Sequence, residues 1–256
     1  MQVLANDLSM ALDPVIFAEQ ALDFKPDPWQ AKALRWSGKR LLLNCSRQSG
    51  KSTTAAVLAL HRALFYSGSL ILLVSPSLRQ SGELFKKVTE LSKLNEGPKL
   101  TENNRLSMTL ENRSRIVSLP STEATIRGFS GAGLIIEDEA SRVDDALYYA
   151  LRPMLAVSGG RIILMSTPFG KRGHFFHEWT EGGESWERIE IPASQCPRIS
   201  PGFLEEERRS IGEWWFSQEY ECRFVETVDQ VFSHALVMAA MDTEILPLFW
   251  GDDYGE

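Results

Sequence analysis

The sequence predicts an α/β fold in which helices cover both faces of a mainly parallel sheet, giving three layers. Three observations lead to this prediction. Short apolar runs, each the length of a buried strand, occur at 41–43, 70–74, 134–136 and 161–165. Helix-like stretches separate these runs, as expected when helical crossovers join parallel strands. A Gly-Lys-Ser turn at 50–52 joins the first run to the helix that follows it.

The first half of the chain supplies its elements in the order that such a fold needs. A helical pattern within residues 1–24 ends at Pro26 and Pro28, which favour a chain break. The elements expected next are a short helix at 29–34, a strand near 40–45, a helix at 51–66, a strand at 70–74 and an amphipathic helix at 78–94.

The second half begins with short alternating strands and ends in an acidic, tryptophan-rich stretch. The expected elements are strands within 105–119, a buried strand at 134–136, a helix at 146–155 and a core strand at 161–165. The stretch 178–226 carries helix signals around 201–223. We expect it to form a small subdomain packed on the sheet, with its aromatic residues in the core rather than stacked on bases: Trp214, Trp215, Phe216 and Tyr220.

Composition excludes several classes of protein. The chain has 256 residues, of which 43% are hydrophobic and 24% charged, as in a soluble globular protein. No apolar run approaches the ~20 residues of a membrane span, and the N-terminal residues do not form a signal peptide. Three cysteines without a CxxC pair argue against a disulfide framework and for a reduced, cytosolic compartment.

The charge is distributed unevenly along the chain. The net charge is −7, but residues 1–127 carry 17 Lys and Arg against 11 Asp and Glu, whereas residues 128–256 carry 10 against 23. One interpretation is a basic face for an anionic partner and a separate acidic face. The other is that solvated helices of the second half are simply acidic.

The segment from Cys45 to Thr53 is the most informative motif, because it has the spacing of a phosphate-binding P-loop between a strand and a helix. Backbone N–H groups and the helix N-terminus can face phosphates, Lys51 can reach the β and γ oxygens, and the Ser52 hydroxyl can bind Mg²⁺. One departure is Cys45, which occupies the position of the first Gly; the alternative is a chance match in an ordinary βα turn. The candidate nucleotide-binding residues are Ser46, Arg47, Gln48, Ser49, Gly50, Lys51, Ser52 and Thr53.

An acidic pair follows the apolar run at 134–136. Hydrolysis of a bound triphosphate needs a carboxylate that holds Mg²⁺ and a base that orients water. Asp138 is the candidate metal ligand and Glu139 the candidate base, whereas we expect Glu137 to cap the strand or to face solvent.

Two further pairs or triplets are candidates for nucleotide recognition and for coupling. Trp29 and Gln30 precede the P-loop; the Gln amide can read an adenine edge while the aromatic ring stacks, or the two are a core Trp and a surface Gln. The triplet at the end of the strand at 161–165 can relay hydrolysis into movement, or can serve only as a rigid turn. Its members are Ser166, Thr167 and Pro168.

Two arginines are candidates for stabilising transition-state charge. Arg47 lies inside the P-loop and would act in cis, whereas Arg127 could reach the nucleotide of a neighbouring subunit. Either residue could instead form a structural ion pair. His174 and His177 are spaced i, i+3, but no other His or Cys is placed to complete a zinc site with them.

Taken in order, these segments resemble the ATPase domain of a large terminase, the motor that packages DNA into viral capsids. The resemblance spans residues 29–232 and rests on motifs at 29–30, 46–52, 75–77, 126–128, 135–140, 166–170 and 216–224. It implies a RecA-like P-loop NTPase core at 1–175, a small lid or linker subdomain at 176–232, and a linker with the start of a ribonuclease H-like domain at 233–256.

The resemblance also implies a function and partners. ATP hydrolysis with Mg²⁺ would drive translocation of double-stranded DNA into a procapsid in the host cytoplasm. Expected partners are the portal protein, the procapsid and a small terminase subunit, in a homo-oligomeric ring, commonly a pentamer; a monomer is the alternative for this chain alone. The candidate DNA contacts are Lys86, Lys87, Lys99, Arg105, Arg113 and Arg115.

By the same resemblance, the last residues look like the first strand of a nuclease domain, with Asp253 at a metal-ligand position. One carboxylate cannot form a two-metal centre, so we expect no nuclease activity, and either a truncated or a naturally short chain. Two other functions remain open: a superfamily-two helicase-like translocase, for which a second motor domain is lacking after residue 170, and a P-loop nucleotide switch that does not hydrolyse.

Overall fold

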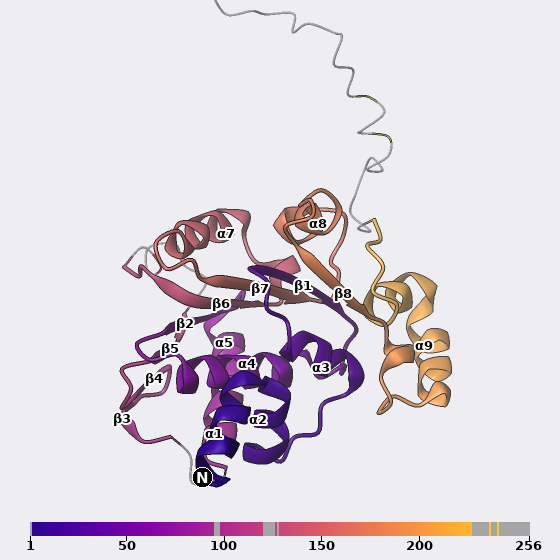
Figure 1. The fold of residues 1–256 in the computed structure, drawn as a ribbon. Helices are drawn as coiled ribbons and strands as arrows, with labels where there is room; N and C mark the ends of the chain where they lie inside the picture. The colour runs from indigo at the N-terminus through magenta and orange to yellow at the C-terminus, as the bar shows by residue number, and fades with distance from the viewer. Residues whose placement is uncertain are drawn as a thin grey trace, which may run out of the picture. The chain divides into compact units, whose positions relative to one another are not determined.

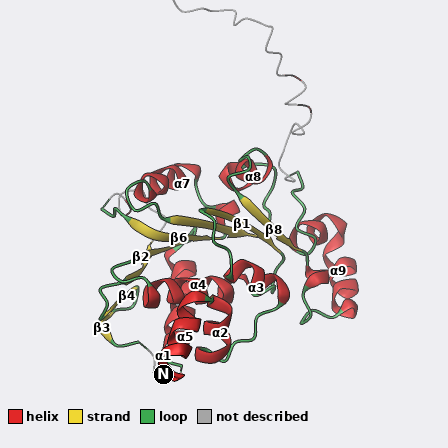
Figure 2. Ribbon diagram, in the orientation of Figure 1, coloured by secondary structure: helices red, strands yellow, loops and turns green. Residues whose placement is uncertain are grey.

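The fold is built around one eight-stranded sheet. The computed structural model describes residues 2–94, 98–119, 126, 128–226, 236 and 240. Residues Met1–Val225 form one compact unit, and Glu226–Glu256 form a second. The strands of the first unit run in the order β3-β4-β5-β2-β6-β7-β1-β8 (Figure 2).

Six of the eight strands are parallel. They are β1 (Arg40–Cys45), β2 (Leu70–Val74), β5 (Arg115–Leu119), β6 (Ala132–Asp138), β7 (Arg161–Ser166) and β8 (Glu187–Ile191). Two antiparallel strands, β3 (Leu100–Asn103) and β4 (Ser107–Leu110), extend one edge. The predicted α/β class with a mainly parallel sheet is confirmed.

The position of β7 decides where the motifs meet. β7 pairs with β1 on one side and with β6 on the other, so Asn44 lies beside Ser166 and Asp138 beside Met165. The three strands are parallel, and their carboxyl ends therefore share one edge of the sheet, where open α/β folds bind ligands. The P-loop, the acidic pair and the Ser166 segment all begin at this edge.

Helices cover both faces of the sheet, as Figure 1 shows. One face carries α3 (Pro28–Leu34), α4 (Lys51–Phe65) and α5 (Leu78–Ser92), with α1 (Gln2–Leu12) and α2 (Pro14–Ala21) outside them. The other carries α7 (Asp145–Leu151) and α8 (Gly173–Thr180), and α9 (Pro201–Glu219) follows β8 in the chain. Short 3-10 helices are η1 (Ala140–Arg142), η2 (Arg152–Leu155) and η3 (Ala193–Gln195).

Several helices begin where the sequence supplies a cap. The side chains of Asp13, Ser77, Asp144 and Ser200 accept hydrogen bonds from the first turns of α2, α5, α7 and α9. Such a cap satisfies a backbone donor that the helix leaves unpaired and contributes about 1 kcal/mol.

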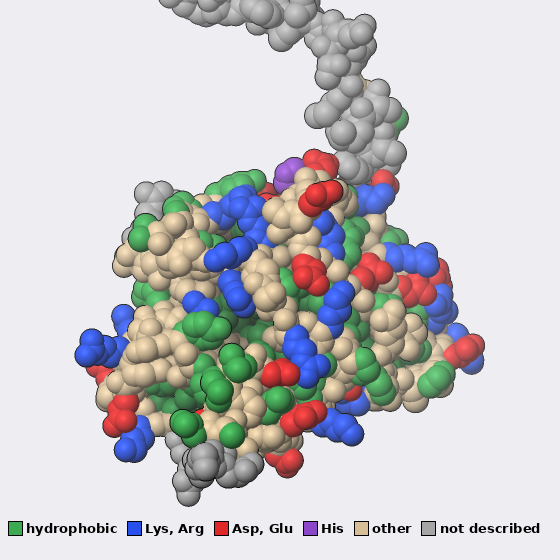
Figure 3. Space-filling view, viewed as in Figure 1, with side chains coloured by type: hydrophobic (Ala, Val, Ile, Leu, Met, Phe, Trp, Pro, Cys, Tyr) green, Lys and Arg blue, Asp and Glu red, His purple; other side chains and the backbone are tan. Residues whose placement is uncertain are grey.

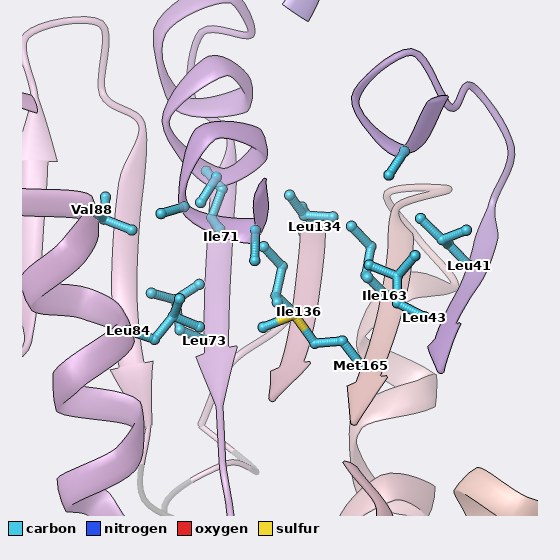
Figure 4. Close-up of a cluster of buried hydrophobic side chains, with 14 of the residues drawn as sticks. Leu41, Leu43, Ile71, Leu73, Leu84, Val88, Leu134, Ile136, Ile163 and Met165 are labelled. Atoms are coloured by element: carbon cyan, nitrogen blue, oxygen red, sulfur yellow. The ribbon is translucent and has the colours of Figure 1, made fainter. Parts of the chain in front are cut away.

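The core follows the alternation of side chains along each strand. Leu41 and Leu43 of β1 pack toward α4, whereas Leu42 packs toward the α7 and α8 face. Figure 4 shows the first of these clusters, in which Ile71 and Leu73 of β2 lie beside Ile136 of β6. Full burial of each such side chain stabilises the fold by about 1.5–3 kcal/mol.

The sequence did not predict β3, β8 or α8. β8 alternates charged and apolar residues within an acidic stretch, and pairs with β1 along only one edge. It belongs to the segment 176–232 that the resemblance assigns to a separate subdomain, yet it extends the central sheet. The division at residue 175 stays a prediction, and the segment 233–256 lies outside the described residues apart from positions 236 and 240.

The surface of α9 mixes charges of both signs (Figure 3). Arg208 contacts Glu213, and Arg209 contacts Glu205, in exposed ion pairs. For this helix, the acidic composition of the second half is therefore that of a solvated surface. Among the described residues, none of the helices combines the length and the apolar character that crossing a membrane requires.

Candidate active site

The P-loop connects β1 to the N-terminus of the 15-residue helix α4. Gln48 and Gly50 have positive φ angles of 60° and 98°. A Cβ atom on Gly50 would lie 2.8 Å from the amide nitrogen of Gln30, so both the φ angle and the space favour glycine there. A hydrogen bond joins the loop to the neighbouring strand β8, because Ser46 N–H donates to the carbonyl of Ile191. An anion is stabilised at such a helix N-terminus.

Cys45, the residue that departs from the P-loop pattern, is the last residue of β1 and is fully buried beside Ile191. Burial raises the pKa of its thiol to about 12, so the side chain is neutral. The position is part of the core and needs no glycine, which explains why a side chain is tolerated.

Lys51 forms an ion pair with the predicted base, Glu139, and is also under the electrostatic influence of the predicted metal ligand, Asp138. Its Nζ is 2.8 Å from Oε1 of Glu139. Burial alone would lower the pKa of Lys51, but Glu139 and Asp138 outweigh burial and raise that pKa. Burial also raises the pKa of Asp138 to about 6, with Lys51 opposing the rise and Glu139 adding to it. The charges of the P-loop lysine and of the acidic pair are therefore close enough to change the pKa values of Lys51 and Asp138.

Two oxygen-bearing side chains near this lysine are suitable ligands for a magnesium ion. Ser52 is the second residue of α4, directly after Lys51, and Asp138 ends β6 at the same sheet edge. Hydroxyl and carboxylate oxygens are ligands that Mg²⁺ prefers, and it usually completes its shell with phosphate oxygens and water.

Trp29 and Gln30 are both buried. Gln30 is 1% exposed; its Oε1 accepts from Asp27 N–H at 2.8 Å, and its Nε2 donates to the carbonyl of Gly50 at 3.4 Å. The alternative of a surface glutamine is therefore wrong, whereas Trp29 does belong to the core. The amide links α3 to the P-loop, and its contact with adenine stays a prediction.

The two candidate arginines have different outcomes. Arg47 Nε donates to Oε2 of Glu219, which is buried at the end of α9, so Arg47 forms an ion pair within the chain. Arg127 lies outside the described residues. The cis or trans role of either arginine stays a prediction.

The segment after β7 touches the turn after Glu139. Ser141 Oγ lies 2.7 Å from Ser166 Oγ and donates to the carbonyl of Thr167 at 2.8 Å. Ser166 and Thr167 are nearly fully buried, and Pro168 follows them. This contact is what a relay would need, and coupling through Ser166, Thr167 and Pro168 stays a prediction.

Glu137 contradicts its prediction. It neither caps the strand nor faces solvent, because its side chain is 0% exposed and its Oε1 lies 2.6 Å from Nε2 of His174. Alternation along β6 turns Glu137 away from the face of Asp138, and α8 supplies the histidine there. Asp145 lies 2.9 Å from Nδ1 of the same ring, and Tyr148 stacks on it at 4.4 Å.

The aromatic residues of α9 follow their prediction only in part. Phe216 and Tyr220 pack with Ala193 in a small core cluster. Trp215 is 46% exposed and is not a core residue, because it lies on the solvent side of a helix that packs through the following residue.

Sequence reasoning missed three side chains that contact the candidate site. Arg142 lies 3.3 Å from Glu139, and its i+3 spacing from that residue was the available signal. Arg198 lies 2.7 Å from Asp27 and donates to the carbonyl of Ser49 at 2.8 Å. Arg198 and Glu219 are distant from the P-loop in sequence, and no local pattern marks them.

A parallel sheet with a Gly-Lys-Ser turn on one strand, and an Asp-Glu pair on the next strand but one, defines a P-loop NTPase with a RecA-like core. The family can be stated more closely. The family model "terminase large subunit, T4likevirus-type, N-terminal" matches residues 42–237, and the chain belongs to this family.

Curated relatives agree with this assignment. The chain is 28% identical over 251 residues to a terminase large subunit of Thermus phage G20c, with 84% of this chain and 52% of the relative covered. A terminase large subunit of Escherichia phage T5 is 34% identical over 106 residues, which cover 38% of this chain and 24% of the relative. The chain thus spans about half the length of the Thermus phage relative.

Solved structures show the same fold. The large terminase ATPase domain of Thermus phage P74-26 superposes with a TM-score of 0.69 at 23% identity, covering 82% of this chain and 97% of that domain. The large terminase of another thermophilic bacteriophage, in complex with ADP, superposes with a TM-score of 0.62 at 11% identity, covering 84% of this chain and 52% of that one. The helicase and nucleotide-switch alternatives are not favoured by these matches.

Proposed function

We propose that this chain hydrolyses ATP as the motor part of a phage DNA-packaging terminase. The observation that carries the proposal is the single cluster formed by Lys51, Asp138 and Glu139 at the carboxyl edge of the sheet, with 2.8 Å between Lys51 Nζ and Glu139 Oε1. A P-loop alone binds phosphate, whereas a P-loop with a metal-ligating carboxylate and a base can hydrolyse it.

The residues divide the work as follows. Backbone N–H groups of the loop and Lys51 bind the phosphates, and Trp29 and Gln30 lie where the base would be recognised. Ser52 and Asp138 would hold Mg²⁺, which would neutralise charge on the phosphate oxygens.

Glu139 orients the attacking water and accepts its proton. In the described structure Glu139 is engaged by Lys51. Triphosphate oxygens compete for the same ammonium group, so nucleotide binding frees one carboxylate oxygen of Glu139 for water.

The wider activity follows from family membership. The relatives are named terminase large subunits, which supports double-stranded DNA, a portal and procapsid, and a small terminase subunit as partners in the host cytoplasm, with a ring as the working assembly. Arg127 would then serve a neighbouring subunit, and the segment 176–232 would act as a lid. Arg47 remains the candidate that acts in cis.

The candidate DNA contacts are not equivalent. Lys87 Nζ donates to Thr53 Oγ1 at 3.4 Å, which turns it toward the P-loop helix. Lys86 and Arg105 line a shared groove between α5 and the β3–β4 hairpin. We therefore rank Lys86 and Arg105 above Lys87 as DNA contacts, with Lys99, Arg113 and Arg115 unchanged.

The substitution Glu139→Ala tests the proposal. We expect the rate of ATP hydrolysis to fall by about 10²- to 10⁴-fold, because general-base catalysis is lost. Binding of ATP, measured by titration calorimetry, should be retained, whereas Lys51→Ala should weaken it. Unchanged turnover in Glu139→Ala would contradict the proposal. A wild-type chain that binds ATP without turnover, even when concentrated and DNA-bound, would instead support a nucleotide switch.

A further inference from the structure

The guanidinium of Arg142 contacts Glu139 and three other side chains near the candidate site. Arg142 ends η1, and its side chain is 26% exposed. Its neighbours belong to three segments that are far apart in the sequence. They are Oε2 of Glu139 at 3.3 Å, Oγ1 of Thr167 at 3.3 Å, Oε1 of Glu219 at 3.7 Å and the ring of Phe169 at 4.5 Å.

Arg142 holds Glu139 at both its backbone and its side chain. Glu139 has φ 54° and ψ 40°, a left-handed conformation that is uncommon for residues other than glycine. The Arg142 N–H donates to the carbonyl of Glu139 at 2.8 Å, and its guanidinium pairs with the carboxylate of the same residue. The turn therefore places the carboxylate instead of leaving it on a freely rotating side chain.

The two carboxylate oxygens of Glu139 have separate cationic partners. Oε1 faces Lys51 at 2.8 Å, and Oε2 faces Arg142 at 3.3 Å. Phosphate oxygens compete for Lys51, since that lysine belongs to the P-loop. Arg142 is outside the P-loop, so phosphate binding at Lys51 leaves the contact between Arg142 and Oε2 of Glu139 available.

The other contacts of Arg142 restrict the orientation of its guanidinium group. The planar guanidinium stacks on the ring of Phe169 and donates to Thr167, both in the segment that follows β7. Glu219, at the end of α9, approaches it from a third side. Displacement of the segment after β7 would thus move the group that orients Glu139.

We propose that Arg142 is a positioning residue for Glu139: it fixes the orientation of the carboxylate through Oε2 and makes that orientation depend on Thr167. The role rests on the proposed ATPase function. Arg142 contacts the carboxylate of the proposed base, so in this proposal it acts through Glu139.

Steady-state ATPase kinetics of Arg142→Ala and Arg142→Lys test the proposal. Loss of a side chain that orients a reactive group reduces activity by about 10- to 100-fold. We expect kcat of Arg142→Ala to fall by about this factor while KM for ATP changes by less than about 2-fold, since ground-state binding is retained. Arg142→Lys keeps the positive charge but lacks the planar guanidinium group. Its kcat should therefore lie between those of wild type and Arg142→Ala.

Arg152→Ala is the matched control. Arg152 is also a partly exposed arginine in an ion pair, 3.2 Å from Glu178, and it stacks over Tyr148 at 5.5 Å. Among the described residues, these two partners lie outside the cluster of Lys51, Asp138 and Glu139, so the kcat of Arg152→Ala should stay near that of wild type. An equal fall in kcat for Arg142→Ala and Arg152→Ala, or wild-type kcat in Arg142→Ala, would overturn the positioning role.

A crystal structure of Arg142→Ala separates this proposal from the ATPase proposal. Absence of wild-type turnover would refute the ATPase function and not the orienting contact. The structure should then still show the Glu139 carboxylate displaced from its position beside Lys51, or Glu139 outside the left-handed region. An unchanged Glu139 in that crystal would refute the positioning role, whatever the turnover.

Discussion

Two glutamates, two positions apart at the end of β6, have opposite surroundings. Glu137 faces α8, has no exposed side-chain surface, and pairs with His174, which is 1% exposed. Glu139 faces the P-loop, is 23% exposed, and pairs with Lys51 and Arg142. The first pair lies entirely inside the protein, whereas the second lies where a ligand can compete for its lysine.

The difference separates a buried anchor at the strand end from a partly exposed carboxylate that a ligand can reach. A buried ion pair resists rearrangement, because separating its partners leaves an uncompensated charge in a medium of low dielectric constant. The pair of Glu137 thus fixes the strand end to α8. The pair of Glu139 is partly exposed, as the proposed role of a catalytic base requires.

The largest expected effect on stability comes from breaking the buried pair. His174→Ala leaves the Glu137 carboxylate without its partner, and we expect the free energy of unfolding to fall by about 3–5 kcal/mol. Glu139→Ala should cost less, because its side chain is partly solvated. Urea denaturation of both variants at neutral pH measures the difference, and equal losses would remove the distinction between the two glutamates.

The pH dependence of stability identifies the charge on the histidine. Burial would lower the pKa of His174, but Glu137 and Asp145 outweigh burial and raise that pKa above 6.5. A histidine whose pKa is raised by folding stabilises the protein fully at pH values below its unfolded-state pKa of about 6.5. This contribution is lost as the pH rises through the folded-state pKa. The free energy of unfolding of wild type should therefore decrease as the pH rises through this range. His174→Ala should not show this decrease when its free energy of unfolding is measured at the same pH values.

A smaller effect is expected from Asp138, which lies between the two glutamates. Burial, opposed by Lys51, raises its pKa to about 6, and a protonated carboxyl group does not ligate Mg²⁺. Between pH 7 and pH 5 the affinity for the magnesium-nucleotide complex should fall by roughly tenfold, since most of the carboxylate becomes protonated. Calorimetric titration measures this, and Asp138→Asn, weak throughout, should not show it. A flat profile in wild type would contradict the raised pKa of Asp138.

Much of the fold could be predicted, because the central strands are short apolar runs and some of the helices between them begin at capping residues such as Ser77 and Asp144. The strands at 40–45, 70–74 and 161–165 match β1, β2 and β7 closely. β8 was missed because its charged residues conceal an edge strand, and α8 because its eight residues cross the predicted boundary at residue 175.

The candidate site could be predicted where its residues are local in sequence. Lys51, Asp138 and Glu139 belong to contiguous motifs, and the structure brings them together. Arg198 and Glu219 reach the P-loop only through the tertiary fold. Glu137 was misassigned because the sequence does not reveal which helix will cover the far face of β6.

The most direct test is a crystal structure with Mg²⁺ and a non-hydrolysable ATP analogue. We predict that Lys51 moves from Glu139 to the phosphates, that Ser52 and Asp138 lie at the metal ion directly or through water, and that Arg142 still holds Glu139 near the γ-phosphate. A bound triphosphate with Asp138 and Glu139 remote from its phosphates would contradict the proposed catalytic site.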